Sequence, residues 1–133
     1  DRSPEKISEV DWVKGALFMI RKNVFEKLSG FDEQIFMYTE DMELCYRAKK
    51  MGYKTYFYPD VSVVHKDLGS SNRSFAVIQI YKGLLYFYKK HKSNLEYELI
   101  KVMLYGKAFI AIFIGTLTGN KYLKTTFRKA IQF

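Results

Sequence analysis

The sequence predicts an α/β fold in its first half, followed by helices at its C-terminus. Two runs favour β-structure: the mostly apolar residues 10–20, and residues 53–58, which a Pro-Asp pair ends. Elsewhere, apolar side chains recur at three- and four-residue steps, the spacing of amphipathic helices. With 133 residues, 48% of them hydrophobic, the chain is long enough to bury one core. We therefore expect a single folded unit.

The first expected strand, residues 10–20, is interrupted at Gly15. A glycine within a strand indicates that another group approaches the backbone closely. Asn23 is placed to cap a short helix over residues 24–28, which a Ser-Gly pair ends. Further strands are expected over residues 53–58 and 61–65.

An acidic helix is expected from Glu40 to Met51, with Gly52 as its stop. At about 100° per residue, Asp41 lies within roughly 60° of small and apolar side chains, so it points with the apolar face. These side chains are Leu44, Cys45 and Ala48. Glu43 lies about 200° away from Asp41 and four residues before Arg47, the spacing of an exposed ion pair, and is expected at the surface.

The acids of this helix allow two interpretations. Carboxylates favour the first turn of any helix because they complement its dipole. The helix dipole does not by itself explain a carboxylate on the inward face, because its burial is costly without hydrogen-bond donors, a cation or a metal. Further along, His65 ends an expected strand beside a polar loop, a position that suits a functional site.

The C-terminal half predicts amphipathic helices over residues 74–92 and 95–118, the second capped by Asn94, and a short basic helix over residues 121–133. Within the second helix, the uncharged run 108–118 is shorter than the ~18 residues that a membrane span requires. We expect it to pack on its own domain, or to contact a membrane surface or another subunit.

The net charge of +8 is unevenly distributed. Residues 1–60 carry 10 Lys/Arg and 11 Asp/Glu (net −1), whereas residues 61–133 carry 12 and 3 (net +9). A basic half can meet nucleic acid, anionic headgroups or phosphorylated substrates. Nucleic acid is disfavoured, because the aromatic residues fall at core spacing and no RNA- or DNA-binding signature is present. A lone cysteine, Cys45, excludes an intramolecular disulfide and a Cys-rich zinc site.

Three segments in order resemble the C-terminal half of family 2 glycosyltransferases, especially the rhamnosyltransferase-like ones. They are WVKGALFMIRK at residues 12–22, GFDEQIFMYTEDMELCYRAKKMGY at residues 30–53, and VSVVHKDLGSS at residues 61–71. The resemblance implies an inverting GT-A enzyme that transfers a sugar from a nucleotide diphosphate donor. It further implies that residues 1–92 are the acceptor-side half of a GT-A catalytic domain and residues 93–133 a helical basic extension.

The same resemblance assigns roles to residues. It implies that Asp41 is the catalytic base, that Glu40 orients the acceptor or its loop, and that His65 is a metal ligand. Acceptor and donor contacts are implied for Trp12, Gly15, Ala16 and Arg73. Taken alone, Trp12 is equally a core aromatic. The cofactor implied for a complete enzyme is a divalent metal, Mn²⁺ or Mg²⁺, with none bound by this chain by itself.

The family's Asp-x-Asp motif in a nucleotide-binding half has no counterpart here: no Asp stands two residues after another Asp, and the similar spacing of Asp41 to Glu43 lies in the acidic helix. We therefore expect a fragment that is inactive without a donor-binding half. The expected partners are a nucleotide sugar, a glycan or lipid-linked acceptor, an anionic membrane surface and a second copy of the chain. The expected setting is cell-surface polysaccharide synthesis at the cytoplasmic face of the plasma membrane. The alternative is a non-catalytic basic module for membrane association or oligomerisation.

Overall fold

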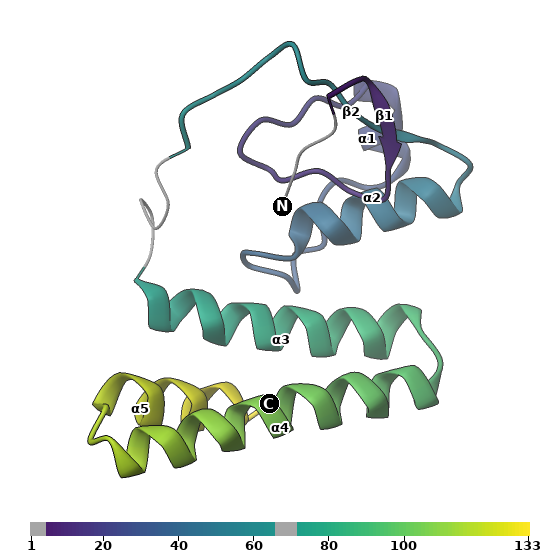
Figure 1. The fold of residues 1–133 in the computed structure, drawn as a ribbon. Helices are drawn as coiled ribbons and strands as arrows, with labels where there is room; N and C mark the ends of the chain where they lie inside the picture. Colours follow the sequence, from purple (N-terminus) through teal and green to yellow (C-terminus); the bar gives the residue numbers. More distant parts are fainter. Residues whose placement is uncertain (1–4, 66–71) are drawn as a thin grey trace. The chain divides into compact units, whose positions relative to one another are not determined.

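The computed structural model describes residues 5–65 and 72–133 (Figure 1). The chain divides into two compact units, Asp1–Ile35 with Thr39–Asp67, and Phe36–Tyr38 with Leu68–Phe133. Each unit has its own hydrophobic cluster, so the expectation of one core is wrong. The expected boundary near residue 92 stays a prediction.

The first unit contains two short antiparallel strands, β1 (Ser8–Val10) and β2 (Thr55–Phe57), in which Glu9 faces Tyr56. The strand expected over residues 53–58 is confirmed in its centre. The strands expected over residues 10–20 and 61–65 are wrong: residues 11–20 lack strand structure, and so do residues 61–65. Both runs favour β-structure locally, but a strand needs a partner for its backbone hydrogen bonds.

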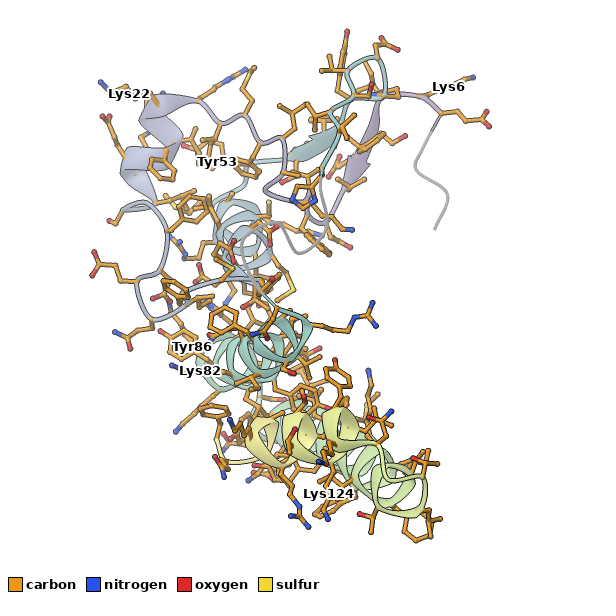
Figure 2. The ribbon with its side chains drawn as sticks, turned by 90° about the vertical axis from the view of Figure 1, so that its left-hand side faces the viewer. Lys6, Lys22, Tyr53, Lys82, Tyr86 and Lys124 are labelled. Atoms are coloured by element: carbon orange, nitrogen blue, oxygen red, sulfur yellow. The ribbon has the colours of Figure 1, made fainter. Side chains whose placement is uncertain are left out.

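Helices α1 (Lys22–Lys27) and α2 (Glu40–Lys50) form the rest of the first unit. Their buried side chains Val24, Leu28, Leu44 and Ala48 make one cluster, against which Tyr53 packs (Figure 2). Asn23 does not cap α1, since the helix already begins at Lys22 after Arg21. The predicted extent of α2 is confirmed to within one residue.

The second unit consists of α3 (Arg73–His91), α4 (Asn94–Leu117) and α5 (Lys121–Ala130), with α5 folded back along α4 (Figure 1). The three expected helices are confirmed. Side chains cap each of them: Asn72 accepts a hydrogen bond from the Phe75 amide, and Asn120 from the Leu123 amide.

Helix α4 begins one residue earlier than expected, and its cap is Ser93 instead of Asn94. The Ser93 Oγ accepts from the Glu96 amide at 3.3 Å, while Glu96 Oε2 accepts from the Ser93 amide at 2.9 Å. This reciprocal capping box satisfies two amides that a helix start leaves without partners.

The core of the second unit forms where α3, α4 and α5 meet. Tyr81, Ala108, Phe127 and Ala130 are its buried members. The Tyr81 ring meets the Phe127 ring edge to face at 6.0 Å between centroids, and its hydroxyl donates to the Leu104 carbonyl at 3.1 Å. Burial raises the pKa of the Tyr81 hydroxyl.

Helix α4 also changes the expectation about membrane spans. The run 108–118 is too short by itself, but the helix that contains it has 24 residues and is long and apolar enough to cross a membrane, by length and composition only. Only 17% of its most apolar window is buried within the chain, which distinguishes it from the core helix of a globular protein.

Candidate active site

The N-terminus of α2 presents the two acids that the sequence singled out. Tyr38, just before it, has φ 79°, in the left-handed region that residues other than glycine seldom occupy. Thr39 is the N-cap residue, and Glu40 and Asp41 are the first two residues of the helix. Backbone strain of this kind is typical of functional sites, because the surrounding structure must hold it in place.

Asp41 is held by two backbone amides. Its Oδ2 accepts a hydrogen bond from the Gly15 amide at 2.8 Å, across 26 residues of sequence, and its Oδ1 accepts from the Met42 amide at 2.7 Å. The carboxylate is half-buried. Each carboxylate oxygen has two lone pairs, so Asp41 keeps acceptor capacity after both bonds are made. An oriented, accessible carboxylate can take a proton from a bound hydroxyl group.

Glu40 and Thr39 lie beside Asp41. The Glu40 Oε2 accepts from the Thr39 amide at 2.9 Å, which turns the Glu40 side chain back over the helix start. The Thr39 side chain is buried, and its Oγ1 has no hydrogen-bond partner among the residues that the structure describes. A buried hydroxyl without a partner is costly, and the Thr39 hydroxyl does not cap α2 either, although threonine is a favoured N-cap residue.

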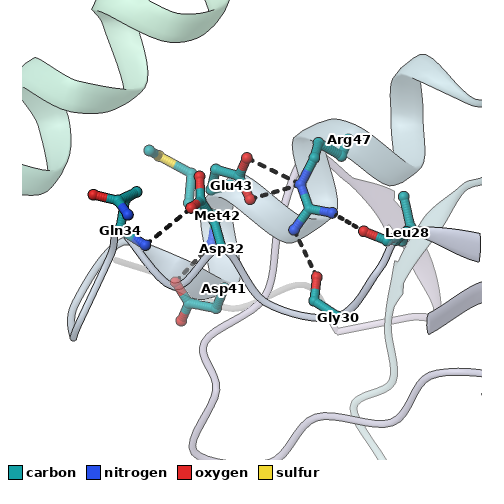
Figure 3. Close-up of polar contacts among 8 residues, drawn as sticks. All are labelled: Leu28, Gly30, Asp32, Gln34, Asp41, Met42, Glu43 and Arg47. Atoms are coloured by element: carbon teal, nitrogen blue, oxygen red, sulfur yellow. Dashed lines mark hydrogen bonds and ion pairs between the residues drawn. The ribbon is translucent and has the colours of Figure 1, made fainter. Parts of the chain in front are cut away.

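Glu43 is the most buried acid of the site region, which corrects the expectation of a surface position. Its side chain is 0% exposed, and Arg47 Nε donates to Glu43 Oε2 at 2.8 Å. The same guanidinium donates to the carbonyls of Leu28 and Gly30, the latter at 2.8 Å (Figure 3). The ion pair with Arg47 was expected, but it is buried because the chain after α1 covers this face of α2.

The Arg47 cluster, defined as Glu43, Arg47 and the carbonyls of Leu28 and Gly30, therefore fastens α2 to the end of α1. Sequence reasoning missed this role. The sequence showed only that Arg47 stands four residues after Glu43, and not that the chain after α1 covers the pair. Asp32 Oδ1, in the loop that follows, accepts from the Gln34 amide at 3.0 Å (Figure 3).

The other expected site residues come from several segments of the chain. Trp12 and Ala16 are exposed, on the same irregular segment as Gly15. His65 is exposed and adjoins residues 66–71, which lie outside the described part of the chain and include much of the expected polar loop. Arg73 is exposed at the start of α3, in the second unit.

A divalent metal needs several ligands at one point. Over residues 5–65 and 72–133, no three or more His, Cys, Asp or Glu side chains gather closely enough to hold one. The described residues of this chain therefore do not fit such an ion by themselves.

Comparison with known proteins identifies the class of protein. Residues 3–81 match the profile of the family described as "Glycosyltransferase like family 2", so the chain belongs to this family and the resemblance read from the sequence is confirmed. No solved structure matches with comparable significance.

Three relatives illustrate the similarity. The N-acetylglucosaminyl-diphospho-decaprenol L-rhamnosyltransferase of Mycobacterium tuberculosis is 36% identical over 64 residues, which are 48% of this chain and 21% of that protein. Rhamnosyltransferase WbbL of Escherichia coli is 36% identical over 66 residues, 50% of this chain and 25% of the relative. The low-salt glycan biosynthesis hexosyltransferase Agl10 of Haloferax volcanii is 31% identical over 75 residues, which are 56% of this chain and 24% of that protein. The chain thus spans a quarter or less of these relatives.

Proposed function

We propose that this chain supplies the acceptor-side part of a GT-A catalytic domain in an inverting glycosyltransferase. The observation that carries the proposal is the Asp41 carboxylate, which two backbone amides orient at the start of α2. Membership of family 2 and the similarity to two rhamnosyltransferases and a hexosyltransferase support the reaction class. Because the chain covers 21–25% of these relatives, the donor-binding part would come from outside the matched region.

In the proposed reaction, Asp41 removes the proton from an acceptor hydroxyl. The oxygen forms a bond to the anomeric carbon of the donor sugar, from the face opposite the leaving group. The bond from that carbon to the nucleoside diphosphate breaks, and the diphosphate leaves with the electron pair, so the configuration inverts. A positioned general base contributes about 10²–10⁴-fold to such a step.

The other residues have supporting roles in this proposal. Glu40 and the buried Thr39 hydroxyl would face the acceptor beside Asp41, and Trp12 with Ala16 would border the sugar. Arg73 would contact an acceptor or donor phosphate. His65 would be one ligand of a divalent ion whose carboxylate ligands come from the donor-binding part. When bound, such an ion stabilises the charge of a departing diphosphate.

The relatives' printed names suggest the substrates. A rhamnosyltransferase that acts on N-acetylglucosaminyl-diphospho-decaprenol adds a sugar to a lipid-linked diphosphate. By analogy, we propose a nucleotide-sugar donor and a glycan or lipid-linked acceptor, in polysaccharide synthesis at the cytoplasmic face of a membrane.

Substitution of Asp41 tests this assignment in a protein in which this chain is joined to a donor-binding half. Asp41→Asn keeps the size and can still accept the Gly15 hydrogen bond, but it is a poor base. We expect turnover to fall by about 10²-fold or more, with the KM for the nucleotide sugar unchanged. The matched control is Asp60→Asn, which neutralises an exposed acid of the same unit and should leave turnover unchanged. Near wild-type turnover of Asp41→Asn would show that another group is the base.

The metal proposal has its own test, calorimetric titration of the 133-residue chain with Mn²⁺. One imidazole cannot build a site, because Mn²⁺ prefers several oxygen and nitrogen ligands. We therefore expect no tight binding. Stoichiometric micromolar binding that disappears in His65→Ala would contradict the view that the other ligands come from elsewhere.

A further inference from the structure

The outer face of α4 is a continuous apolar surface. Nine large side chains along it are between 44% and 71% exposed. This α4 stripe comprises Leu95, Leu99, Val102, Met103, Phe109, Ile110, Phe113, Ile114 and Leu117. At about 100° and about 1.5 Å per residue, these positions cover an arc of roughly 140° and a length of about 33 Å.

No charged residue interrupts the α4 stripe. Lys107 and Glu96 project from one margin of it, and Glu98 from the other, by the same helical phase. The opposite face of α4 packs on α3 and α5 through buried Ala108 and Gly115, so the stripe is the face that its own unit leaves uncovered. Apolar patches larger than a few hundred Å² mark interaction sites in soluble proteins.

Charge identifies the partner. Residues 73–133 carry 11 Lys/Arg and 2 Asp/Glu, a net charge of +9. A second copy would bring the same positive charge to the contact, whereas an anionic lipid surface is complementary to it. On α5, the exposed face is basic, through Lys121, Arg128 and Lys129, with half-buried Lys124 beside them. Figure 2 labels Lys124 on the side of this unit that lies away from α3.

The packing of α4 also determines how it can meet a bilayer. If α4 crossed the membrane, α5 would enter the hydrocarbon with it, because α5 packs along α4 and carries four basic residues in ten. Charged side chains at that depth are costly. A helix that lies in the plane of the interface, with an apolar face down and lysines at headgroup level, avoids this cost.

We propose that the α4 stripe lies in the plane of a membrane interface that contains anionic lipid, with Lys107 at the margin of the stripe and the net positive charge of residues 73–133 attracted to the headgroups. This proposal does not depend on the transfer reaction, so the failure of either one leaves the other standing. Through the α4 stripe, the chain would stay at the membrane, where a lipid-linked acceptor is found.

Vesicle flotation of the 133-residue chain tests the proposal. The chain should float with vesicles of phosphatidylcholine and phosphatidylglycerol and not with phosphatidylcholine alone. Raising NaCl from about 0.1 M to about 1 M should release it, because the Debye length falls from about 10 Å to about 3 Å. Binding that is equal on both kinds of vesicle would overturn the role of charge.

A pair of matched variants tests the stripe itself. Phe109→Gln with Phe113→Gln removes two rings that are 59% and 63% exposed, without changing the net charge. Lipid affinity should fall by at least about tenfold. The control is Met19→Gln with Val64→Gln, which removes two apolar side chains that are 97% and 95% exposed in the first unit, and affinity should stay unchanged.

Circular dichroism should show native helix content in both pairs, since none of these side chains is buried. Equal losses in the two pairs would overturn the proposal. A second outcome would also overturn it: the unmodified chain sediments as a dimer, the Phe109→Gln, Phe113→Gln variant sediments as a monomer, and neither of the two floats with vesicles.

Depth measurements separate an in-plane helix from a spanning one. An environment-sensitive fluorophore on cysteines introduced at Leu95, Ile110 or Leu117 reports depth, and Cys45 is buried and shielded from labelling. An in-plane α4 predicts the same shallow quenching depth at all three positions. A deep centre between two shallow ends would mean that α4 spans the bilayer, and would overturn the in-plane arrangement.

Discussion

Replacing Arg47 with methionine should destabilise the first unit by about 3–5 kcal/mol. Methionine keeps much of the apolar stem but removes the guanidinium, which leaves the 0% exposed Glu43 carboxylate without this cation and the Leu28 and Gly30 carbonyls without these donors. Removing one partner of a buried ion pair costs about 3–5 kcal/mol, because the remaining charge stays buried. At roughly 0.05–0.15 kcal/mol per residue, the first unit, with 35 and 29 residues in its two segments, is stable by about 3–10 kcal/mol. The loss is therefore large enough to measure.

Urea unfolding followed by the fluorescence of Trp12 measures this loss. Trp12 is the only tryptophan and lies in the first unit, so its signal reports that unit even if the two units unfold separately. Glu43→Leu combined with Arg47→Met should be more stable than Arg47→Met alone, because the double variant no longer buries a carboxylate that has lost the Arg47 cation. As the control, Lys49→Met breaks the exposed pair with Asp11 and should hardly move the midpoint. A loss below about 1 kcal/mol in Arg47→Met would refute this account of the Arg47 cluster.

Two further predictions concern the second unit. A Cβ at Gly115 would lie 2.8 Å from a backbone nitrogen of α5, so Gly115→Ala should cost about 1–3 kcal/mol in thermal unfolding. Gly106→Ala, where a Cβ meets nothing within 4 Å, should stabilise α4 by about 0.5–1 kcal/mol, and the opposite order would contradict the packing of α4 on α5. Hydrogen bonds from Ser93 hold the pKa of Glu96 below its ordinary 4.5. The charged Glu96 of the capping box therefore stabilises α4 at neutral pH, and this stabilisation is lost as the pH falls from 4.5 through the lowered pKa. In Ser93→Ala, an NMR titration should show the Glu96 pKa rising toward 4.5, and an unchanged value would remove the capping box as its cause.

Local signals predicted the helices well. The span of α2 follows from good helix formers between an acidic start and Gly52, and the extent of α3 follows from apolar periodicity, whereas α5 ends at Ala130, before the expected residue 133. The cap of α4 was missed by one residue, because Ser93 and Asn94 are both good caps and only the reciprocal bond with Glu96 decides between them.

The non-local parts could not be predicted in the same way. Residues 10–20 favour a strand by composition, yet the only partner in the described sheet, β2, pairs with residues 8–10. Helical phase placed Glu43 on a different face of α2 from Asp41. It does not show that the chain after α1 covers the face with Glu43. The hydrogen bond from Gly15 to Asp41 joins residues 26 apart, and nothing in the local sequence requires it. The resemblance to family 2 named both residues without giving their contact.

The three acids of the α2 start are not equivalent, and their surroundings favour one of them as the base. Glu43 is fully buried and held by Arg47, so it cannot reach a substrate. Glu40 is turned back onto the amide of its neighbour Thr39, a contact that orients its own helix start. Asp41 is half-buried, and its bond to the distant Gly15 amide fixes the carboxylate relative to a separate segment of the chain. Since a general base must be both oriented and within reach of a substrate hydroxyl, the geometry favours Asp41 over its two neighbours.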